Sequence, residues 1–189
     1  MHKIAILASG SGSNAENIVR HFHGGDDVRV AVVLSNKADA GVHERMQCLG
    51  VETVTLGNDV WADRPSEVIA ELEARGVELV VLAGFLRKIH PDIVAAYRGR
   101  MLNIHPSLLP AYGGKGMYGR RVHEAVLAAG ERETGVTVHH VTDEIDGGAI
   151  VAQDRVSISS GETVATLEAK IHHLEHSLYP RAIAATLGL

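Results

Sequence analysis

The sequence predicts an α/β fold: a Rossmann-like, mostly parallel sheet flanked by helices, with an antiparallel strand pair after the central strand and a long C-terminal helix. Short apolar runs alternate with segments of helical period through the first two thirds of the chain, which is typical of a buried parallel sheet covered by helices. A glycine-rich turn follows the first run, and two longer alternating runs lie nearer the C-terminus. A chain of 189 residues can build one substantial core, so we expect a single domain over residues 1–189.

The first four strands are predicted from short apolar runs that end at polar or turn-forming residues. They lie at 3–8, 28–34, 51–55 and 77–83. Helical periodicity predicts helices at 13–23, 40–49 and 91–97. A further helix starts at a cap, Asp63 or Arg64, has Pro65 in its first turn and ends at Gly76. Cys48 belongs to the apolar face of its helix, so we expect it in the core.

The run 101–105 is the predicted central strand, and two hydrogen-bonding side chains lie at its end. Alternate side chains of a strand share a face, so Asn103 and His105 point the same way, roughly 6–7 Å apart. Pro106 cannot donate a ladder hydrogen bond and Pro110 follows, so a loop begins just after His105. Open parallel sheets bind ligands at the carboxyl ends of their strands, so we expect chemistry here. A simple turn or capping role for both side chains is the alternative.

After Pro110 the pattern changes from repeated βα units to a helix and two long strands. A glycine-rich loop at 113–119 leads to a predicted helix at 121–129. Alternating runs at 135–141 and 149–158 predict an antiparallel pair joined by the loop 142–148. The last helix is expected at 162–187, with Thr163 or Gly161 near its start and a kink at Pro180.

Composition narrows the class of protein. A net charge of −5 without an extended basic cluster makes duplex nucleic acid or an anionic membrane an unlikely partner. The single cysteine excludes an internal disulfide. No apolar run approaches the length of a membrane span, and the first strand begins too early for a signal peptide. We therefore expect a cytoplasmic protein.

The glycine-rich turn at 9–14 is predicted to bind an anion. It lies between the first strand and the first helix, where free backbone N–H groups at a helix N-terminus attract negative charge. The spacing of Gly10, Gly12 and Ala15 also fits a dinucleotide fingerprint, but Asn36 and Lys37 stand where an acidic ribose ligand is expected. A phosphate monoester is the preferred ligand, with NADP and a merely capped turn as alternatives.

Asp146 is the predicted partner of His105. It lies in the loop between the two antiparallel strands, which follow the central strand in sequence and are expected beside it. A carboxylate there would orient the imidazole and favour its cationic form. His139 is a weaker supporting candidate. His172 and His176 share a helix face, but without further ligands a zinc site is disfavoured and a solvated face preferred, as for His173.

Four segments together resemble the folate-dependent formyltransferases. They are 10–14 (Gly-Ser-Gly-Ser-Asn), 83–87 (Ala-Gly-Phe-Leu-Arg), 103–110 (Asn-Ile-His-Pro-Ser-Leu-Leu-Pro) and 143–148 (Asp-Glu-Ile-Asp-Gly-Gly). The resemblance covers nearly the whole chain, and the 10–14 loop narrows it to members that act on glycinamide ribonucleotide. It implies a purine-biosynthetic enzyme that uses 10-formyltetrahydrofolate as co-substrate and requires no metal.

The resemblance also implies roles for individual residues. The catalytic set would be Asn103, His105 and Asp146. Gly12, Ser13 and Asn14 would bind the ribonucleotide phosphate, and Glu175 the ribose hydroxyls. The folate contacts would be Arg64, Leu86, Arg87, Lys88, Ile89, Asn103 and Asp143. The partners would be these small molecules alone, with the chain a monomer or a homodimer.

The chemistry of formyl transfer fits the same residues. An amine that attacks a formyl group creates an oxyanion and must lose a proton, while the folate nitrogen leaves protonated. Asn103 supplies an N–H donor, and a cationic His105 supplies a second donor that can also give up its proton. A formyltetrahydrofolate hydrolase and an initiator-tRNA formyltransferase are related alternatives, although by resemblance each carries an additional domain. An NADP-dependent oxidoreductase and a non-catalytic nucleotide-binding module are the alternatives of other classes.

Overall fold

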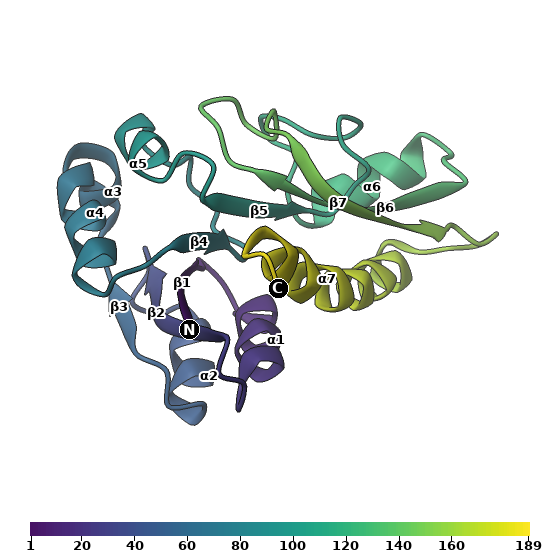
Figure 1. Ribbon diagram of the computed structural model, residues 1–189. Helices are drawn as coiled ribbons and strands as arrows, with labels where there is room; N and C mark the ends of the chain where they lie inside the picture. The colour runs from purple at the N-terminus through teal and green to yellow at the C-terminus, as the bar shows by residue number, and fades with distance from the viewer. The chain divides into compact units, whose positions relative to one another are not determined.

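The structure is a computed structural model that describes all 189 residues (Figure 1). Its seven strands form a sheet in the order β3-β2-β1-β4-β5-β6-β7. The chain divides into two compact units, Met1–Asn103 with Leu189 and Ile104–Gly188. Strand β5 (Met101–His105) contributes its first residues to one unit and its last two to the other. The mostly parallel sheet, its antiparallel pair and the long last helix confirm the predicted fold class.

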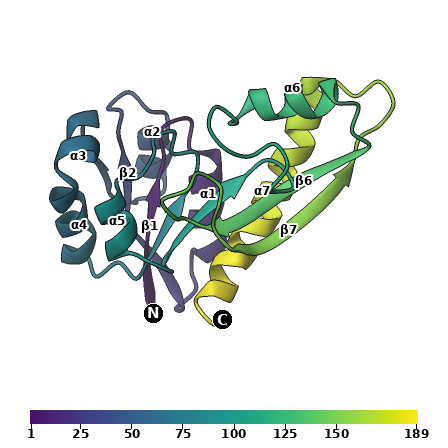
Figure 2. The same ribbon diagram turned by 90° about the horizontal axis from the view of Figure 1, so that it is seen from above.

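The first unit alternates parallel strands and helices. Its complete strands are β1 (His2–Leu7), β2 (Val28–Ser35), β3 (Thr53–Thr55) and β4 (Leu79–Leu82). Its helices are α1 (Ser13–Phe22), α2 (Val42–Cys48), α3 (Asn58–Asp63), α4 (Pro65–Ala74) and α5 (Pro91–Ala96). Helices α1 and α2 lie on one face of these strands, and α3, α4 and α5 lie on the other (Figures 1 and 2).

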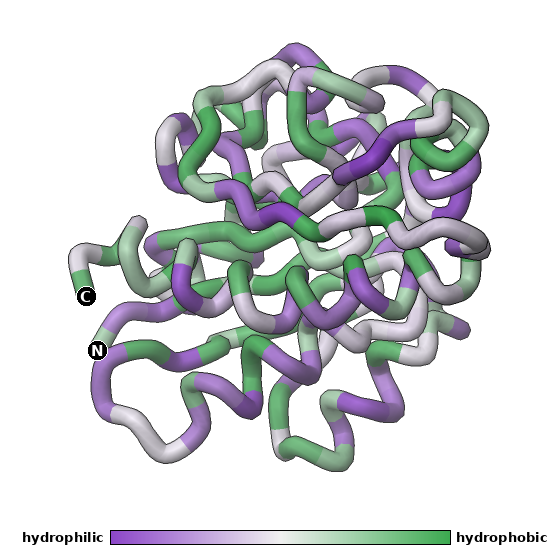
Figure 3. The backbone as a smooth tube through the Cα atoms, turned by 90° about the vertical axis from the view of Figure 1, so that its right-hand side faces the viewer, coloured by the Kyte–Doolittle hydropathy of each residue, from purple (hydrophilic) through white to green (hydrophobic).

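Strands β1, β2 and β4 of the first unit are largely apolar and buried, as expected of parallel strands covered on both faces. Ile4, Ile6 and Leu7 of β1 are completely buried, and every residue of β4 is buried. Figure 3 shows the resulting alternation of hydrophobic and hydrophilic stretches along the backbone. Each fully buried aliphatic side chain contributes about 1.5–3 kcal/mol relative to an exposed one, so these strands contribute substantially to the stability of this unit.

The order β3-β2-β1-β4 contains a reversal between β1 and β4. The chain builds outward from β1 to β3 and then returns to place β4 on the other side of β1. The turns that follow β1 and β4 therefore diverge at the carboxyl edge of the sheet, which is where such sheets bind ligands. The predicted anion-binding turn is one of the two.

The second unit is built on an antiparallel pair. Strands β6 (Glu133–His140) and β7 (Ile150–Ser157) run antiparallel, and helices α6 (Arg120–Ala128) and α7 (Val164–Thr186) complete the unit. Helix α7 packs against both strands and against α6 (Figure 1). Thr163 caps α7 by accepting the backbone N–H of Thr166, so the predicted start near Thr163 is confirmed.

Two predictions about helices were wrong or incomplete. Helix α3 was not predicted, because one short turn-and-a-half segment that buries only Val60 and Trp61 has no extended helical period. Cys48 was expected in the core but is exposed. The buried positions of α2 are Val42 and Met46, four residues apart, and two further residues rotate Cys48 to the opposite side of the helix.

The helices can be compared with the requirements of a membrane span. No helix in the structure combines the length and the apolar character that crossing a bilayer requires.

Candidate active site

His105 lies buried at the end of β5, and both of its ring nitrogens face an acceptor. Nε2 is 2.8 Å from the backbone carbonyl oxygen of Tyr112, and Nδ1 is 3.5 Å from Oδ2 of Asp146. A carbonyl oxygen can only accept, so Nε2 carries a hydrogen and donates it to Tyr112. The sequence-based expectation that the loop between the antiparallel strands brings Asp146 to His105 is thus met by the geometry.

The Asp146 carboxylate is held from several directions. Oδ2 accepts the backbone N–H of Gly114 at 2.9 Å, and Oδ1 lies 3.5 Å from Nε2 of His139. Only 9% of the Asp146 side chain is exposed, and His139 is buried. The glycine-rich loop 113–119 and the loop 142–148 therefore meet at this carboxylate, which lies between two imidazoles.

The backbone on both sides of His105 adopts a conformation that residues with a side chain seldom take. Tyr112 and Asp146 are the two non-glycine residues with positive φ, and each has φ of 56°. That left-handed conformation costs about 1–2 kcal/mol for an ordinary L-residue. One of these residues supplies the carbonyl to Nε2 and the other the carboxylate near Nδ1. The fold therefore holds the surroundings of one imidazole against a local conformational cost.

The pKa values of the pair follow from burial and charge. Burial lowers the pKa of His105 below its ordinary value, although the Asp146 carboxylate opposes this shift. Burial raises the pKa of Asp146, but the hydrogen bond from His139 and the Gly114 N–H, together with the His105 charge, lower it below its usual range. The expectation that Asp146 keeps His105 cationic was wrong in its net direction, because burial outweighs the carboxylate.

The loop that follows His105 is fixed by residues that sequence reasoning missed. The buried Thr137 hydroxyl of β6 donates to the carbonyl of Ser107 at 2.6 Å and accepts the N–H of Leu109 at 3.0 Å. Gln153 of β7 donates to the same hydroxyl and to the Leu109 carbonyl. Three backbone groups of the loop, the Ser107 and Leu109 carbonyls and the Leu109 N–H, therefore find partners on the antiparallel pair. Nothing in the sequence distinguishes Thr137 from any other inward strand residue.

Gly148, the last residue of the Asp-Gly-Gly motif, has a packing role. A Cβ built on Gly148 would lie 1.7 Å from the carbonyl oxygen of His140. No side chain fits there, so only glycine lets the strand β7 return close enough to β6 after the Asp146 turn.

Glu175 is buried in the middle of α7. Its Oε2 lies 3.1 Å from Nδ1 of His172, and this hydrogen bond raises the pKa of His172. His172 is thus paired with a carboxylate. No group of three or more His, Cys, Asp or Glu side chains is arranged to hold a metal ion.

The predicted phosphate-binding turn lies in the first unit. Gly12 has φ of 79° and precedes α1, so Ser13 and Asn14 form the first turn of that helix with their backbone N–H groups at its N-terminus. A Cβ on Gly12 would lie 2.6 Å from Cγ2 and 2.8 Å from Cα of Val42. Gly12 is therefore required by the backbone conformation and by the packing against α2, before any ligand is considered.

The predicted folate segment follows β4 in the same unit. Leu86 is 60% exposed, whereas Ile89 is buried, so the segment is anchored at one end and open at the other. The guanidinium of Arg64 forms ion pairs with Asp59 at 2.5 Å and with Glu67 at 2.9 Å. Asp143, in the second unit, is exposed. The two ion pairs of Arg64 are with Asp59 and Glu67 and not with the 86–89 segment.

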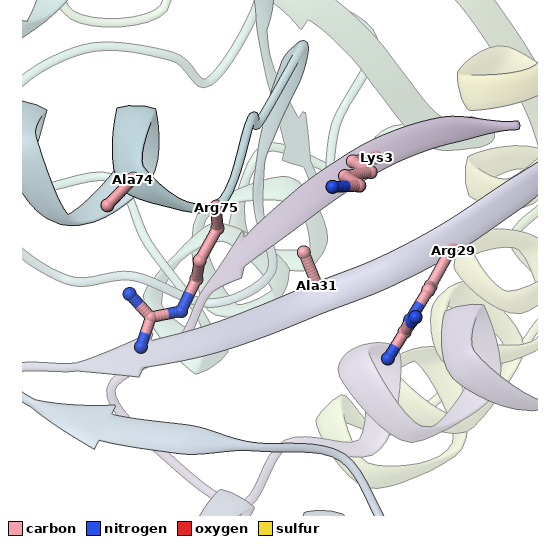
Figure 4. Close-up of a pocket in the computed structure, with 5 residues that line it drawn as sticks. All are labelled: Lys3, Arg29, Ala31, Ala74 and Arg75. Atoms are coloured by element: carbon pink, nitrogen blue, oxygen red, sulfur yellow. The ribbon is translucent and has the colours of Figure 1, made fainter.

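A pocket of about 220 Å³ also lies in the first unit, but at the other edge of the strands. It is lined by Lys3, Arg29, Ala31, Ala74 and Arg75 (Figure 4). Lys3 and Arg29 belong to the beginnings of β1 and β2, whereas the predicted site residues follow the strand ends. Arg75 is already paired with Glu52 and Glu71, so we do not include this pocket in the candidate site.

The class of protein follows from this arrangement and from comparison with known families. The formyl transferase family model matches residues 2–183, so the chain belongs to the formyl transferase family. The match extends through both compact units.

The relatives narrow the class further. The chain is 39% identical over 189 residues to the phosphoribosylglycinamide formyltransferase of Escherichia coli, covering 96% of this chain and 85% of the relative. It is 39% identical over 191 residues to the chloroplastic phosphoribosylglycinamide formyltransferase of Arabidopsis thaliana, covering 97% of this chain but 64% of the relative. The crystal structure of glycinamide ribonucleotide transformylase 1 from Symbiobacterium toebii superimposes with a TM-score of 0.91 at 37% identity, covering 100% of this chain and 88% of that one.

Proposed function

We propose that this chain transfers the formyl group of 10-formyltetrahydrofolate to the amine of glycinamide ribonucleotide. The observation that carries the proposal is the buried His105–Asp146 pair, 3.5 Å apart, at the end of the strand that also bears Asn103. Family membership and relatives named phosphoribosylglycinamide formyltransferase support the same reaction.

The proposed reaction is a direct transfer through a tetrahedral intermediate. The amine nitrogen attacks the formyl carbon, a C–N bond forms, and the carbonyl electron pair moves to oxygen. The oxyanion then re-forms the carbonyl while the bond between that carbon and the folate nitrogen breaks, and the nitrogen keeps the bonding pair. The amine gives up one proton and the folate nitrogen gains one, so the protein carries a proton and consumes none. The Asn103 amide and the N–H at Nε2 of His105 are the proposed donors to the oxyanion.

The lowered pKa of His105 suits a proton carrier better than a permanently charged donor. In the imidazolium both ring nitrogens carry a hydrogen, with Nδ1 facing Asp146, and the lowered pKa makes this form a stronger acid: Nε2 gives its proton to the folate nitrogen and then takes up the proton that the amine loses. Asp146 stabilises this transient cation. Because Nε2 donates to the Tyr112 carbonyl, the substrate must replace or share that acceptor.

The remaining predicted residues are proposed to bind and orient the two substrates. The backbone of Gly12, Ser13 and Asn14 would bind the phosphate at the start of α1, and Glu175 the ribose hydroxyls. The folate contacts are proposed for one set of residues: Arg64, Leu86, Arg87, Lys88, Ile89, Asn103 and Asp143. Binding both substrates through remote groups would bring amine and formyl carbon together, which is the proximity contribution.

The dinucleotide alternative gains no support from the end of β2. Asn36, at the position of the expected ribose ligand, is buried and its side chain bonds Ser9 and Asn58 rather than facing outward. We further propose a cytoplasmic enzyme with small-molecule partners only, active as a monomer or a homodimer, and independent of metal.

The proposal is tested by incubating the chain with glycinamide ribonucleotide and 10-formyltetrahydrofolate and following formylated product and tetrahydrofolate together. We expect the two to appear in equal amounts, and the dephosphorylated substrate to bind far more weakly. Tetrahydrofolate released without formylated product would indicate a hydrolase. Tight binding of NADPH with indifference to the phosphate would indicate an oxidoreductase. Either result would overturn the proposal.

A further inference from the structure

A buried hydrogen-bond chain joins three strand ends of the first unit, and the proposed reaction does not use it. The Ser9 hydroxyl donates to Oδ1 of Asn36 at 2.6 Å and accepts the backbone N–H of Leu86 at 3.0 Å. Nδ2 of Asn36 donates to Oδ1 of Asn58 at 2.9 Å. The chain runs from the turn after β4, through the residues that follow β1 and β2, to the first residue of α3.

The hydrogen-bond chain is buried at its two central residues. Ser9 is 3% exposed and Asn36 is 8% exposed. The hydroxyl has one hydrogen, which goes to Asn36, so its oxygen is the acceptor for Leu86. Buried polar groups are costly to leave unpaired, so the Ser9 hydroxyl, the Asn36 amide and the Leu86 N–H fix one another's orientation.

Ser9 holds the turn after β4 by two separate bonds. Its backbone N–H donates to the Gly84 carbonyl at 3.0 Å, while its hydroxyl accepts the N–H of Leu86. Removing the hydroxyl would leave the first bond in place. The effect of such a change should therefore fall on the Leu86 backbone and not on the pairing of β1 with β4.

We propose that Ser9 is a positioning residue for the folate side of the site. Its hydroxyl sets the Leu86 backbone, and through it the 86–89 segment, relative to the glycine turn at 9–14, of which Ser9 is the first residue. The Leu86 side chain is exposed while its backbone is tied down, which is the arrangement expected of a segment that presents a side chain to a ligand. The link to folate rests on the proposed function; the bond from Ser9 to Leu86 does not.

Ser35 is a matched control for Ser9. This residue is also a fully buried serine at the end of a neighbouring strand, but its hydroxyl bonds only the backbone of Lys37, at 3.2 Å. Ser35→Ala removes a serine hydroxyl that is equally buried and leaves the hydrogen bonds of Ser9, Asn36 and Leu86 intact. Asn58→Ala, at the exposed end of the chain, is a milder variant that spares the buried members.

The first test is hydrogen exchange at the Leu86 amide by NMR. We expect Ser9→Ala to speed exchange of that amide at least about tenfold, and Ser35→Ala to leave it unchanged. Equal protection of Leu86 in the wild type and in Ser9→Ala would overturn the positioning role, whatever the ligand is.

The second test is calorimetric binding of tetrahydrofolate, which requires no turnover. Ser9→Ala should raise Kd about tenfold, corresponding to about 1.4 kcal/mol, and Asn58→Ala less. Ser35→Ala should stay near wild type, and Ser9→Thr, which keeps a hydroxyl, should restore binding. An unchanged Kd in Ser9→Ala would contradict the inference. A wild type that does not bind tetrahydrofolate would contradict the proposed function, while the exchange test still decides on Ser9.

Discussion

The glycine turn after β1 and the His105 site after β5 are built in opposite ways. The turn is formed from six consecutive residues, 9–14, and offers backbone N–H groups, so its chemistry is local in sequence. The His105 site joins a strand end to three other segments: the loop with Tyr112 and Gly114, the strand with His139 and the loop with Asp146. A site built from backbone groups is therefore sensitive to added atoms, whereas a site built from side chains is sensitive to the loss of a group.

The largest effect is expected for His105→Ala, because it removes both a donor and the proton carrier. We predict that turnover falls by about 10²–10⁴ while the affinity for the ribonucleotide hardly changes. Steady-state kinetics and calorimetry on the same preparation check both parts. Near-normal turnover in a folded variant would remove His105 from the chemistry.

Asn103→Ala should have the next largest effect, since it deletes one proposed oxyanion donor and nothing titratable. Turnover should fall by roughly 10²–10³ without a change in the pH dependence. The decisive measurement is whether kcat falls or KM for 10-formyltetrahydrofolate rises. A rise in KM alone would show that Asn103 only positions the co-substrate.

The glycine turn gives a smaller effect of a different kind. Gly12→Ala places a Cβ within 2.8 Å of the Val42 backbone at a positive φ, so we predict a loss of at least about 2 kcal/mol in the free energy of unfolding. Gly10→Ala is the matched control, because a Cβ there has no atom within 4 Å. Urea unfolding measures both.

Substrate binding to the Gly12→Ala and Gly10→Ala variants complements the stability measurement. Phosphorylated substrate should bind more weakly to Gly12→Ala, mainly because the turn is distorted. If Gly12→Ala were as stable as Gly10→Ala, the packing explanation for this glycine would be wrong.

The local features of the site could be predicted from the sequence. The prolines after His105 predicted the end of the strand that bears Asn103 and His105, and the structure ends β5 at His105. The position of the glycine turn at the start of α1 followed from the same kind of reasoning. These features depend only on neighbours in the chain, so they survive without knowledge of the tertiary fold.

Features that depend on distant backbone could not be predicted. A left-handed conformation is expected for glycine or asparagine, so nothing marked Tyr112 as the residue whose carbonyl meets His105. The direction of the His105 pKa required its burial as well as its carboxylate partner, and burial is set by the surrounding elements. The roles assigned to Glu175, Arg64, Asp143 and the 86–89 segment remain predictions.

The proposed reaction depends on the His105–Asp146 pair. Titration of the His105 ring by NMR tests this pairing directly. In the wild type we expect a pKa below the ordinary histidine value, because burial dominates. Asp146→Asn removes the charge that favours the imidazolium, so the His105 pKa should fall further and turnover at neutral pH should drop, by about tenfold or more. A His105 titration that is the same in both proteins, with turnover also unchanged, would contradict the pairing and leave Asp146 as a turn residue without a part in the reaction.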